Sequence, residues 1–159
     1  MLSKTTRILL ASIFALFTSF AVQADGAIPQ AKNLQTLGQK ALQKNIPIAI
    51  LFASQGLKST QNLKDLALDP IVMSGELDDK VIFTELHPND GNSTIDFYGE
   101  KTANSEFKQI YNLTSLPVVI FVNGEGDQIA PPLLSGAYDF YYHYFKQHLE
   151  QAQKQLDSQ

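Results

Sequence analysis

Two hydroxyl side chains stand where a short loop is expected to lead from a buried strand into a helix. Ile46 to Ala53 is an almost unbroken apolar run of strand length, and Gln55-Gly56 interrupts it. Ser59 and Thr60 follow at the place where a helix N-cap is wanted. The free N–H groups and positive dipole end of a helix start favour an anion such as a thiolate. The two hydroxyls could therefore hydrogen-bond a thiol or an anionic group of a ligand.

A nucleophilic role for these hydroxyls would require a base beside them, because a hydroxyl of ordinary acidity is a poor nucleophile. Lys58 is the only candidate base close in sequence. The simpler interpretation, which we favour, is that Ser59 or Thr60 caps the helix and Lys58 is solvated. The chain contains no cysteine. Thiol–disulfide exchange is therefore excluded, since that chemistry needs a thiolate nucleophile.

The remaining residue types that could do chemistry do not form a convincing site in the sequence. His143 and His148 lie five apart on an expected helix, roughly 140° around its axis, so one face cannot present both. His87 ends an expected strand elsewhere in the chain. Asp78-Asp79 lies in a charged turn, where adjacent carboxylates are usually solvated. The sequence thus predicts no metal site, no catalytic residue and no cofactor.

The elements that would position the loop alternate between helix and strand. Apolar periodicity and turn residues predict helices over 30–44, 60–68, 69–73, 102–112 and 138–154, and strands over 46–53, 81–87, 117–122 and 128–134. Strands separated by helices imply right-handed parallel crossovers. The turn signal at Gly124–Asp127 predicts a closing antiparallel hairpin, so the sheet should be mixed. Pro131-Pro132 places the last strand at a sheet edge.

Three local expectations are specific enough to be tested by a structure. Asp69-Pro70 is expected to be an N-cap and N1 pair that opens a new short helix. The polar stretch 88–101 is expected to be a long loop. The helix over 102–112 should place its apolar residues in the core: Phe107, Ile110 and Tyr111.

The N-terminus is typical of a secretory signal peptide, with cleavage after Ala24. Lys4 and Arg7 precede the apolar stretch 8–22, and Val22-Gln23-Ala24 provides a cleavage site. A membrane anchor is the alternative, but the stretch is short for a span of about 20 residues. The mature chain would be one domain over 25–159, located in the periplasm.

The composition of that mature chain restricts its partners. Cleavage leaves 10 lysines, no arginine and 16 acidic residues, a net charge of −6. Arginine is the usual bidentate reader of phosphate and guanine, so nucleic acid is not an expected partner. An anionic membrane surface is not expected either. In the absence of cysteine, the core alone must stabilise the domain.

The order and spacing of several segments resemble secreted bacterial thioredoxin-like domains, over about residues 45 to 155. The matching segments are Phe52–Thr60, Leu68–Val72, Val81–Glu85, Tyr111–Phe121, Asn123–Gly126 and Gly136. The resemblance implies a thioredoxin-like three-layer α/β/α fold with a central mixed sheet of about four strands and an additional N-terminal helix. It also implies a cis-proline at Pro117. Leu57 and Thr60 occupy the positions of the family's two cysteines, so the Cys-x-x-Cys motif is absent.

Two classes of function follow from this resemblance. The first is a redox-inactive protein- or peptide-binding module, chaperone-like or an assembly partner, whose groove is formed by Leu57, Lys58, Ser59, Thr60, Leu116 and Pro117. In the family, the residue before the cis-proline pairs its backbone with an extended peptide. The second is a cysteine-independent enzyme that binds a thiol cofactor such as glutathione through Ser59 and Thr60. The sequence leaves open whether Leu57 is exposed or turns into the core.

A second candidate surface lies on the last helix. Phe140 and Tyr144 fall on a different side from the stripe expected to face the core. They would either cover neighbouring elements or form an exposed aromatic patch for a partner.

Overall fold

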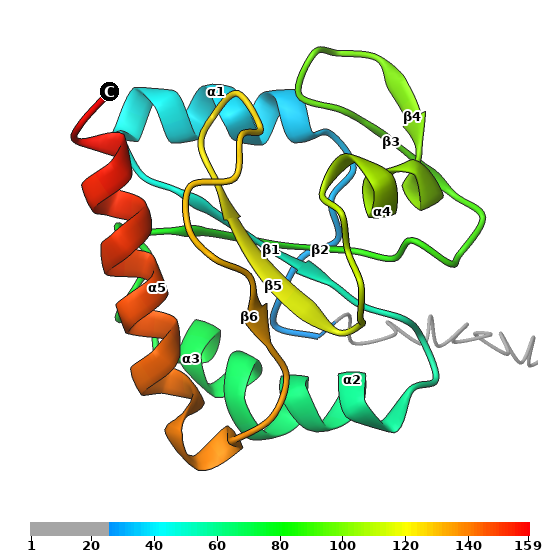
Figure 1. The fold of residues 1–159 in the computed structure, drawn as a ribbon, viewed down its shortest axis with the longest axis vertical. Coiled ribbons are helices and arrows are strands. Elements are labelled where there is room, and N and C mark those ends of the chain that lie inside the picture. The colour runs from blue at the N-terminus through cyan, green and yellow to red at the C-terminus, as the bar shows by residue number, and fades with distance from the viewer. Residues whose placement is uncertain (1–25) are drawn as a thin grey trace, which may run out of the picture.

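A mixed four-stranded sheet forms the middle layer of the fold (Figure 1). The computed structural model describes residues 26–159, so the expected signal peptide and its cleavage point lie outside the described residues. The strand order is β2-β1-β5-β6, and the strands are β1 (Ile48–Phe52), β2 (Ile82–Leu86), β5 (Val118–Val122) and β6 (Leu133–Leu134). β1 pairs in parallel with β2 and antiparallel with β5, and β5 pairs antiparallel with β6.

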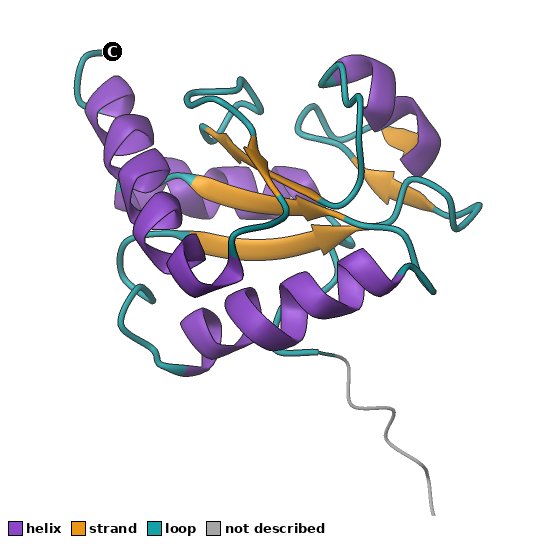
Figure 2. Cartoon of the chain, turned by 60° about the horizontal axis from the view of Figure 1, so that its bottom comes forward, coloured by secondary structure: helices purple, strands orange, loops and turns teal. Residues whose placement is uncertain are grey.

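Helices cover both faces of this sheet, which explains why its central strands are apolar throughout (Figure 2). One face, with Leu51 and Phe121, packs against the helical segment 58–73 and α5 (Tyr141–Leu156). The other face, with Ile50 and Ile120, packs against α1 (Leu34–Lys44) and α4 (Phe107–Ile110). None of the helices within residues 26–159 is long and apolar enough to cross a membrane.

β5 runs antiparallel to β1, whereas a helix-linked crossover between the strands would make them parallel. The register pairs Phe52 with Val118, so β5 starts at the end of the sheet where β1 finishes. β2 also finishes at that end, and the only α-helix between β2 and β5 is the four-residue α4. A helix this short does not carry the chain back along the sheet. The chain therefore re-enters the sheet from the end it left, and the pairing is antiparallel.

The stretch 88–101, expected as a loop, contains most of a small second sheet. β3 (Ser93–Ile95) pairs antiparallel with β4 (Lys101–Ala103). Polar contacts hold this hairpin at its base, where the Thr94 hydroxyl lies 2.8 Å from Asn104 Oδ1. The helix expected over 102–112 begins later than predicted, because β4 extends to Ala103 and a 3₁₀ turn (Asn104–Glu106) then precedes α4. Phe107 is buried as expected, but Ile110 is 58% exposed.

Helix α1 begins four residues later than the expected start at residue 30. The Asn33 side chain accepts a hydrogen bond from Thr36 N–H at 2.9 Å and caps the helix. The preceding residues instead lie along the outer edge of β2, where Ala31 N–H donates to Glu85 C=O at 2.8 Å and Glu85 N–H to Pro29 C=O at 2.9 Å. Pairing with a distant strand thus prevails over local helical spacing.

A short α-helix begins at Asp69 with Pro70 in its first turn, as expected, but Asp69 is not its N-cap, because the helical path continues through the pair. α2 (Lys58–Leu63) continues through a π-helical turn (Lys64–Leu68) into α3 (Asp69–Met73), and Asp69 itself has helical dihedrals. In a regular α-helix a proline ring clashes with the carbonyl group four residues before it. The wider π turn immediately before Pro70 accommodates the ring and lets the helix continue.

Two glycines allow α1 to approach the turn after β5 closely. A Cβ atom built on Gly38 would overlap the carbonyl oxygen of Gly124, and one built on Gly124 would lie 2.6 Å from the carbonyl oxygen of Gly38. Both obstacles are backbone atoms, which cannot rotate away as the end of a side chain can. The packing of α1 against the hairpin therefore depends on glycine at both positions.

Replacing Gly38 by alanine should destabilise the protein even though alanine is the better helix former. Helix propensity favours alanine by up to about 1 kcal/mol, whereas overpacking typically costs about 1–3 kcal/mol. We expect a net loss of roughly 1–2 kcal/mol in the free energy of unfolding, measured by urea titration. The exposed neighbour Gln39→Ala is the matched control and should change stability by less than about 0.5 kcal/mol. An unchanged free energy of unfolding in Gly38→Ala would show that the turn after β5 can move away from α1 without cost.

Candidate functional site

The loop that leads from β1 into α2 is short and held by its own backbone. Gly56 has a φ of +77°, a left-handed conformation that favours glycine. Leu57 N–H donates to Ser54 C=O at 3.4 Å, and α2 begins at Lys58. Leu57 is the N-cap residue and provides no side-chain cap. The expectation that Ser59 or Thr60 caps the helix is therefore wrong, because the helix starts before them.

The residues expected to form the groove lie at one end of the sheet, with different exposures. Leu57 is 44% exposed, and Lys58 is also exposed. Leu116 is half-buried and Pro117 is buried. The Leu116–Pro117 peptide bond is cis. Because Phe52 pairs with Val118, continuing the register by one residue places Pro117 opposite Ala53, directly before the loop that carries Leu57.

The hydroxyls of the expected site are less available than the sequence suggests. Thr60 is only 6% exposed, and its Oγ1 accepts a hydrogen bond from Ser54 N–H at 3.4 Å. Ser59 is half-buried. The buried Thr60 side chain thus holds the loop through its hydrogen bond with Ser54, a role that the sequence pattern did not indicate.

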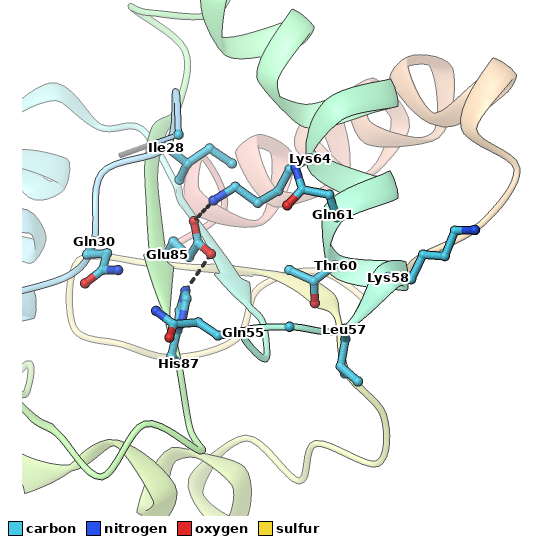
Figure 3. A pocket seen from close by; sticks show the side chains of 12 residues that line it. Ile28, Gln30, Gln55, Leu57, Lys58, Thr60, Gln61, Lys64, Glu85 and His87 are labelled. Atoms are coloured by element: carbon cyan, nitrogen blue, oxygen red, sulfur yellow. Dashed lines mark hydrogen bonds and ion pairs between the residues drawn. The ribbon is translucent and has the colours of Figure 1, made fainter. Parts of the chain in front are cut away.

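A pocket of about 550 Å³ opens beside the same loop, on the side of α2 (Figure 3). Its lining combines residues of the loop, of α2 and of the turn after α2 with the C-terminal end of β2 and the chain segment before α1. Its lining includes Leu57, Thr60, Lys64, Glu85 and His87. Leu57 belongs to this lining and to the expected groove, so the two features are continuous. Figure 3 shows Lys58 pointing away from Glu85.

A buried carboxylate with two partners lies in the lining of this pocket. Glu85 Oε2 lies 2.6 Å from Lys64 Nζ, and Glu85 Oε1 lies 2.6 Å from His87 Nε2. The side chains of Glu85, His87 and Lys64 are 2%, 8% and 17% exposed, respectively. Figure 3 shows the two partners reaching the carboxylate from different sides. We call these three residues the ion cluster.

The ion cluster keeps Glu85 ionised. Burial alone would raise the pKa of this carboxyl, but the hydrogen bonds from His87 and Lys64 outweigh burial and hold the pKa below its ordinary value of 4.5. Next to Lys64, burial dominates at Asp69 and raises the pKa of that carboxyl. An ionised Glu85 accepts hydrogen bonds only, so Nε2 of His87 must carry the proton that lies between them.

The chemistry open to the ion cluster is limited by its burial. Nδ1 of His87 is buried and has no hydrogen-bond partner among the residues that the structure describes. An imidazole oriented by a carboxylate has the arrangement of a general base or a metal ligand. However, no group of three or more histidine, aspartate and glutamate residues within 26–159 is placed to hold a metal ion. In this conformation the cluster forms a rigid polar wall of the pocket.

Sequence reasoning missed Lys64 and Glu85 as site residues and considered His87 only as a metal ligand. A charged residue within a strand that is buried on both faces is a signal, and residues two apart on a strand share a face. Glu85 and His87 could therefore have been paired from the sequence. Nothing in the sequence indicates that Lys64, on the next helical segment, completes the cluster.

The remaining candidate residues lie on α5 or just before it. Phe140 and Tyr144 are 64% and 42% exposed, so neither is covered by a neighbouring element. A 3₁₀ turn (Tyr138–Phe140) precedes α5 and contains the first of them. His148 Nδ1 lies 2.8 Å from the carbonyl oxygen of Pro131, and His143 is exposed.

Comparisons with known proteins give a likeness in structure only. No profile of a known family matches the chain, and no curated protein matches it. Among solved structures, a DsbH oxidoreductase has a TM-score of 0.57 at 15% identity, over 79% of this chain and 87% of its own. A thioredoxin from Nicotiana alata covers 76% of this chain and 94% of its own, at a TM-score of 0.42 and 14% identity.

A thioredoxin-fold protein from Helicobacter pylori covers 71% of this chain and 85% of its own, with a TM-score of 0.36 and 16% identity. The latter two scores are too low to support an argument. At such identities the likeness to the DsbH oxidoreductase establishes the fold alone. Together with the mixed sheet and its two helical layers, it shows that this chain has the thioredoxin fold and lacks the Cys-x-x-Cys motif.

Proposed function

We propose that this chain is a redox-inactive periplasmic protein that binds an extended peptide segment of a partner protein. The groove comprises Leu57 and Leu116 with the buried Pro117 between β1 and β5. The observation that carries the proposal is the exposure of Leu57, 44%, at the end of the sheet where the chain enters β5. Burying a leucine against a partner contributes roughly 1.5–3 kcal/mol.

The backbone beside Leu57 supports peptide binding by strand addition. The N–H and C=O groups of Leu116 make no hydrogen bond to other backbone groups within residues 26–159. An extended peptide could pair with these groups and place an apolar side chain against Leu57. Main-chain pairing of this kind provides affinity, and the apolar contact provides preference for particular side chains.

The alternative, an enzyme that binds a thiol cofactor through Ser59 and Thr60, is less well supported. Thr60 is buried, and its oxygen already accepts a backbone hydrogen bond. Its hydroxyl would have to leave that contact or donate from within the fold to reach a cofactor. The two functions still predict different ligands, so one binding experiment separates them.

The test follows backbone amide signals of the ¹⁵N-labelled protein during two titrations. One probe is reduced and carboxymethylated α-lactalbumin, which is permanently unfolded, and the other is glutathione in both redox forms. Peptide binding in the groove should shift the amide signals of Leu57 and Leu116 with the unfolded chain, and glutathione should leave them unchanged. Shifts at residues 57–60 with glutathione alone would favour the enzyme. The absence of shifts with both probes would refute the groove.

A further inference from the structure

A second cleft, of about 360 Å³, lies away from the groove and has a distinct chemical character. The turn between β3 and β4, the end of α4 and the turn after β5 form its walls. Its lining includes Asp96, Tyr98, Ile110, Tyr111, Glu125 and Asp127. We call this the acidic cleft. Because the turn after β5 follows Val122 and the groove precedes Val118, the two sites lie at opposite ends of β5.

The walls of the acidic cleft are fixed to one another. The ring of Phe97 packs against Gly126 so closely that a Cβ on that glycine would lie 2.5 Å from the ring. The Tyr111 hydroxyl donates to the carbonyl oxygen of Gly126 at 3.0 Å. The Asp96 carboxylate accepts from the backbone N–H groups of Tyr98 and Glu100, both at 2.9 Å. The cleft therefore exists before any ligand binds.

The charged side chains that line the acidic cleft are all negative. Asp96, Glu125 and Asp127 line it, and none of its lining residues is basic. None of the three carboxylates forms an ion pair within the part of the chain that the structure describes. Burial favours the neutral form of Asp96, but hydrogen bonds outweigh it and keep the pKa of this carboxyl low. Burial, and then the charge of Asp127, raise the pKa of Tyr111.

Large apolar surfaces rim the same cleft without being covered. Tyr98 is 79% exposed and Ile110 is 58% exposed. Both oxygens of Asp96 already accept hydrogen bonds, from Tyr98 and Glu100 N–H and from the Thr102 hydroxyl, so Glu125 and Asp127 are the carboxylates open to a ligand. Uncovered aromatic and aliphatic groups beside these two carboxylates match the side chain of arginine, whose planar cation stacks on rings and binds carboxylates through several N–H groups. We propose that the acidic cleft binds an arginine side chain presented by a partner protein.

The proposal does not depend on the groove, because it uses other residues and another ligand. The test titrates the ¹⁵N-labelled protein with a capped Ala-Arg-Ala peptide and with the matched Ala-citrulline-Ala peptide, which is uncharged. We expect shifts of the Tyr98, Ile110 and Gly126 amide signals with the arginine peptide only. Binding should weaken as salt is added, since the carboxylates are exposed to screening.

Variants assign the binding to the cleft. Glu125→Gln combined with Asp127→Asn should weaken binding by about tenfold or more, and Tyr98→Ala by about fivefold. Tyr98→Phe retains the ring and should bind like the wild type. Glu100→Gln removes an acidic charge from the same hairpin outside the lining and is the matched control.

Four results would overturn the assignment. Equal shifts with both peptides would show that the positive charge of arginine is not recognised. No shifts with either peptide would show that the cleft does not bind an arginine side chain. An equal loss of affinity in Glu100→Gln would show a response to overall charge. Tighter binding of tetramethylammonium than of the arginine peptide would assign the cleft to a small cation in place of a partner protein.

Discussion

Replacing Glu85 by alanine is expected to lower the free energy of unfolding by about 3 kcal/mol, the lower end of the range for breaking a buried ion pair. The change leaves Lys64 Nζ and His87 Nε2 without the carboxylate that each contacts at 2.6 Å. The lower end applies because the Lys64 side chain is 17% exposed and can be partly hydrated. In thermal melting the loss should appear as a drop in Tm on the order of 10 °C.

A second variant tests whether the loss comes from leaving Lys64 charged and unpaired beside an empty site. Lys64→Met combined with Glu85→Leu removes both partners of one ion pair and fills the space with apolar groups. Such replacements of a whole pair are often neutral or stabilising. The double variant should therefore be more stable than Glu85→Ala alone. Single changes commonly alter the free energy of unfolding by about 1 kcal/mol. A loss no larger than that in Glu85→Ala would contradict the expectation.

The effect of Glu85→Ala should also depend on pH. The pKa of Glu85 is lower in the folded protein than its ordinary value of 4.5. Its ionised form therefore contributes stability that is fully present above that ordinary value and is lost as the pH falls through the folded value. The difference between wild type and Glu85→Ala should be largest near neutral pH and should shrink on acidification below pH 4.5.

Changing both Leu57 and Leu116 to aspartate is expected to weaken binding of an unfolded polypeptide by well over tenfold. Fully burying an exposed leucine contributes roughly 1.5–3 kcal/mol, and the 44% exposed Leu57 and the half-buried Leu116 each gain a part of that. An aspartate carboxylate held against an apolar partner adds a desolvation cost, and each 1.4 kcal/mol corresponds to about a factor of ten. The measurement is the dissociation constant for reduced, carboxymethylated α-lactalbumin. Leu66→Asp, at a leucine that is 60% exposed on the helical segment 58–73, is the control and should retain affinity.

Stability measurements decide whether the loss arises in the groove. Leu57 is 44% exposed, so Leu57→Asp should change the free energy of unfolding by no more than about 1 kcal/mol. Leu116 is half-buried and packs against the core, so Leu116→Asp is expected to cost more. Loss of binding in Leu57→Asp at an unchanged melting temperature would support the groove. Unfolding of that variant would show that Leu57 is part of the core.

The sequence predicted the fold class well because its strongest signals come from strands buried on both faces. The apolar runs around Ile50 and Ile120 became adjacent central strands, and both lie in the core. The β3–β4 hairpin was missed for a physical reason. Its strands are three residues long and polar, and contacts such as that between Thr94 and Asn104 hold them, rather than an apolar pattern.

The candidate site could be predicted in its backbone and only partly in its side chains. The order of elements alone implied a parallel β5, which would have put Leu116 at the far end of the sheet from Leu57. The resemblance to thioredoxin-like domains, through the segment with the cis-proline, placed the two leucines together, and the antiparallel pairing of β1 with β5 agrees with that placement. The burial of Thr60 and the approach of Lys64 to Glu85 depend on how the segment 58–73 rotates against the sheet. That rotation is set by packing between distant residues, which local spacing does not encode.

Little of either outer edge of the sheet, along β2 and β6, is open to pairing with another molecule. Pro29 and Ala31 occupy the outer side of β2 through hydrogen bonds to Glu85, and β6 is only two residues long and follows Pro131-Pro132. Long uncovered strand edges are the usual template for aggregation. A domain without disulfides opens locally more readily than one that is cross-linked. The short and covered edges therefore limit the surface from which copies of this protein could form intermolecular β-structure.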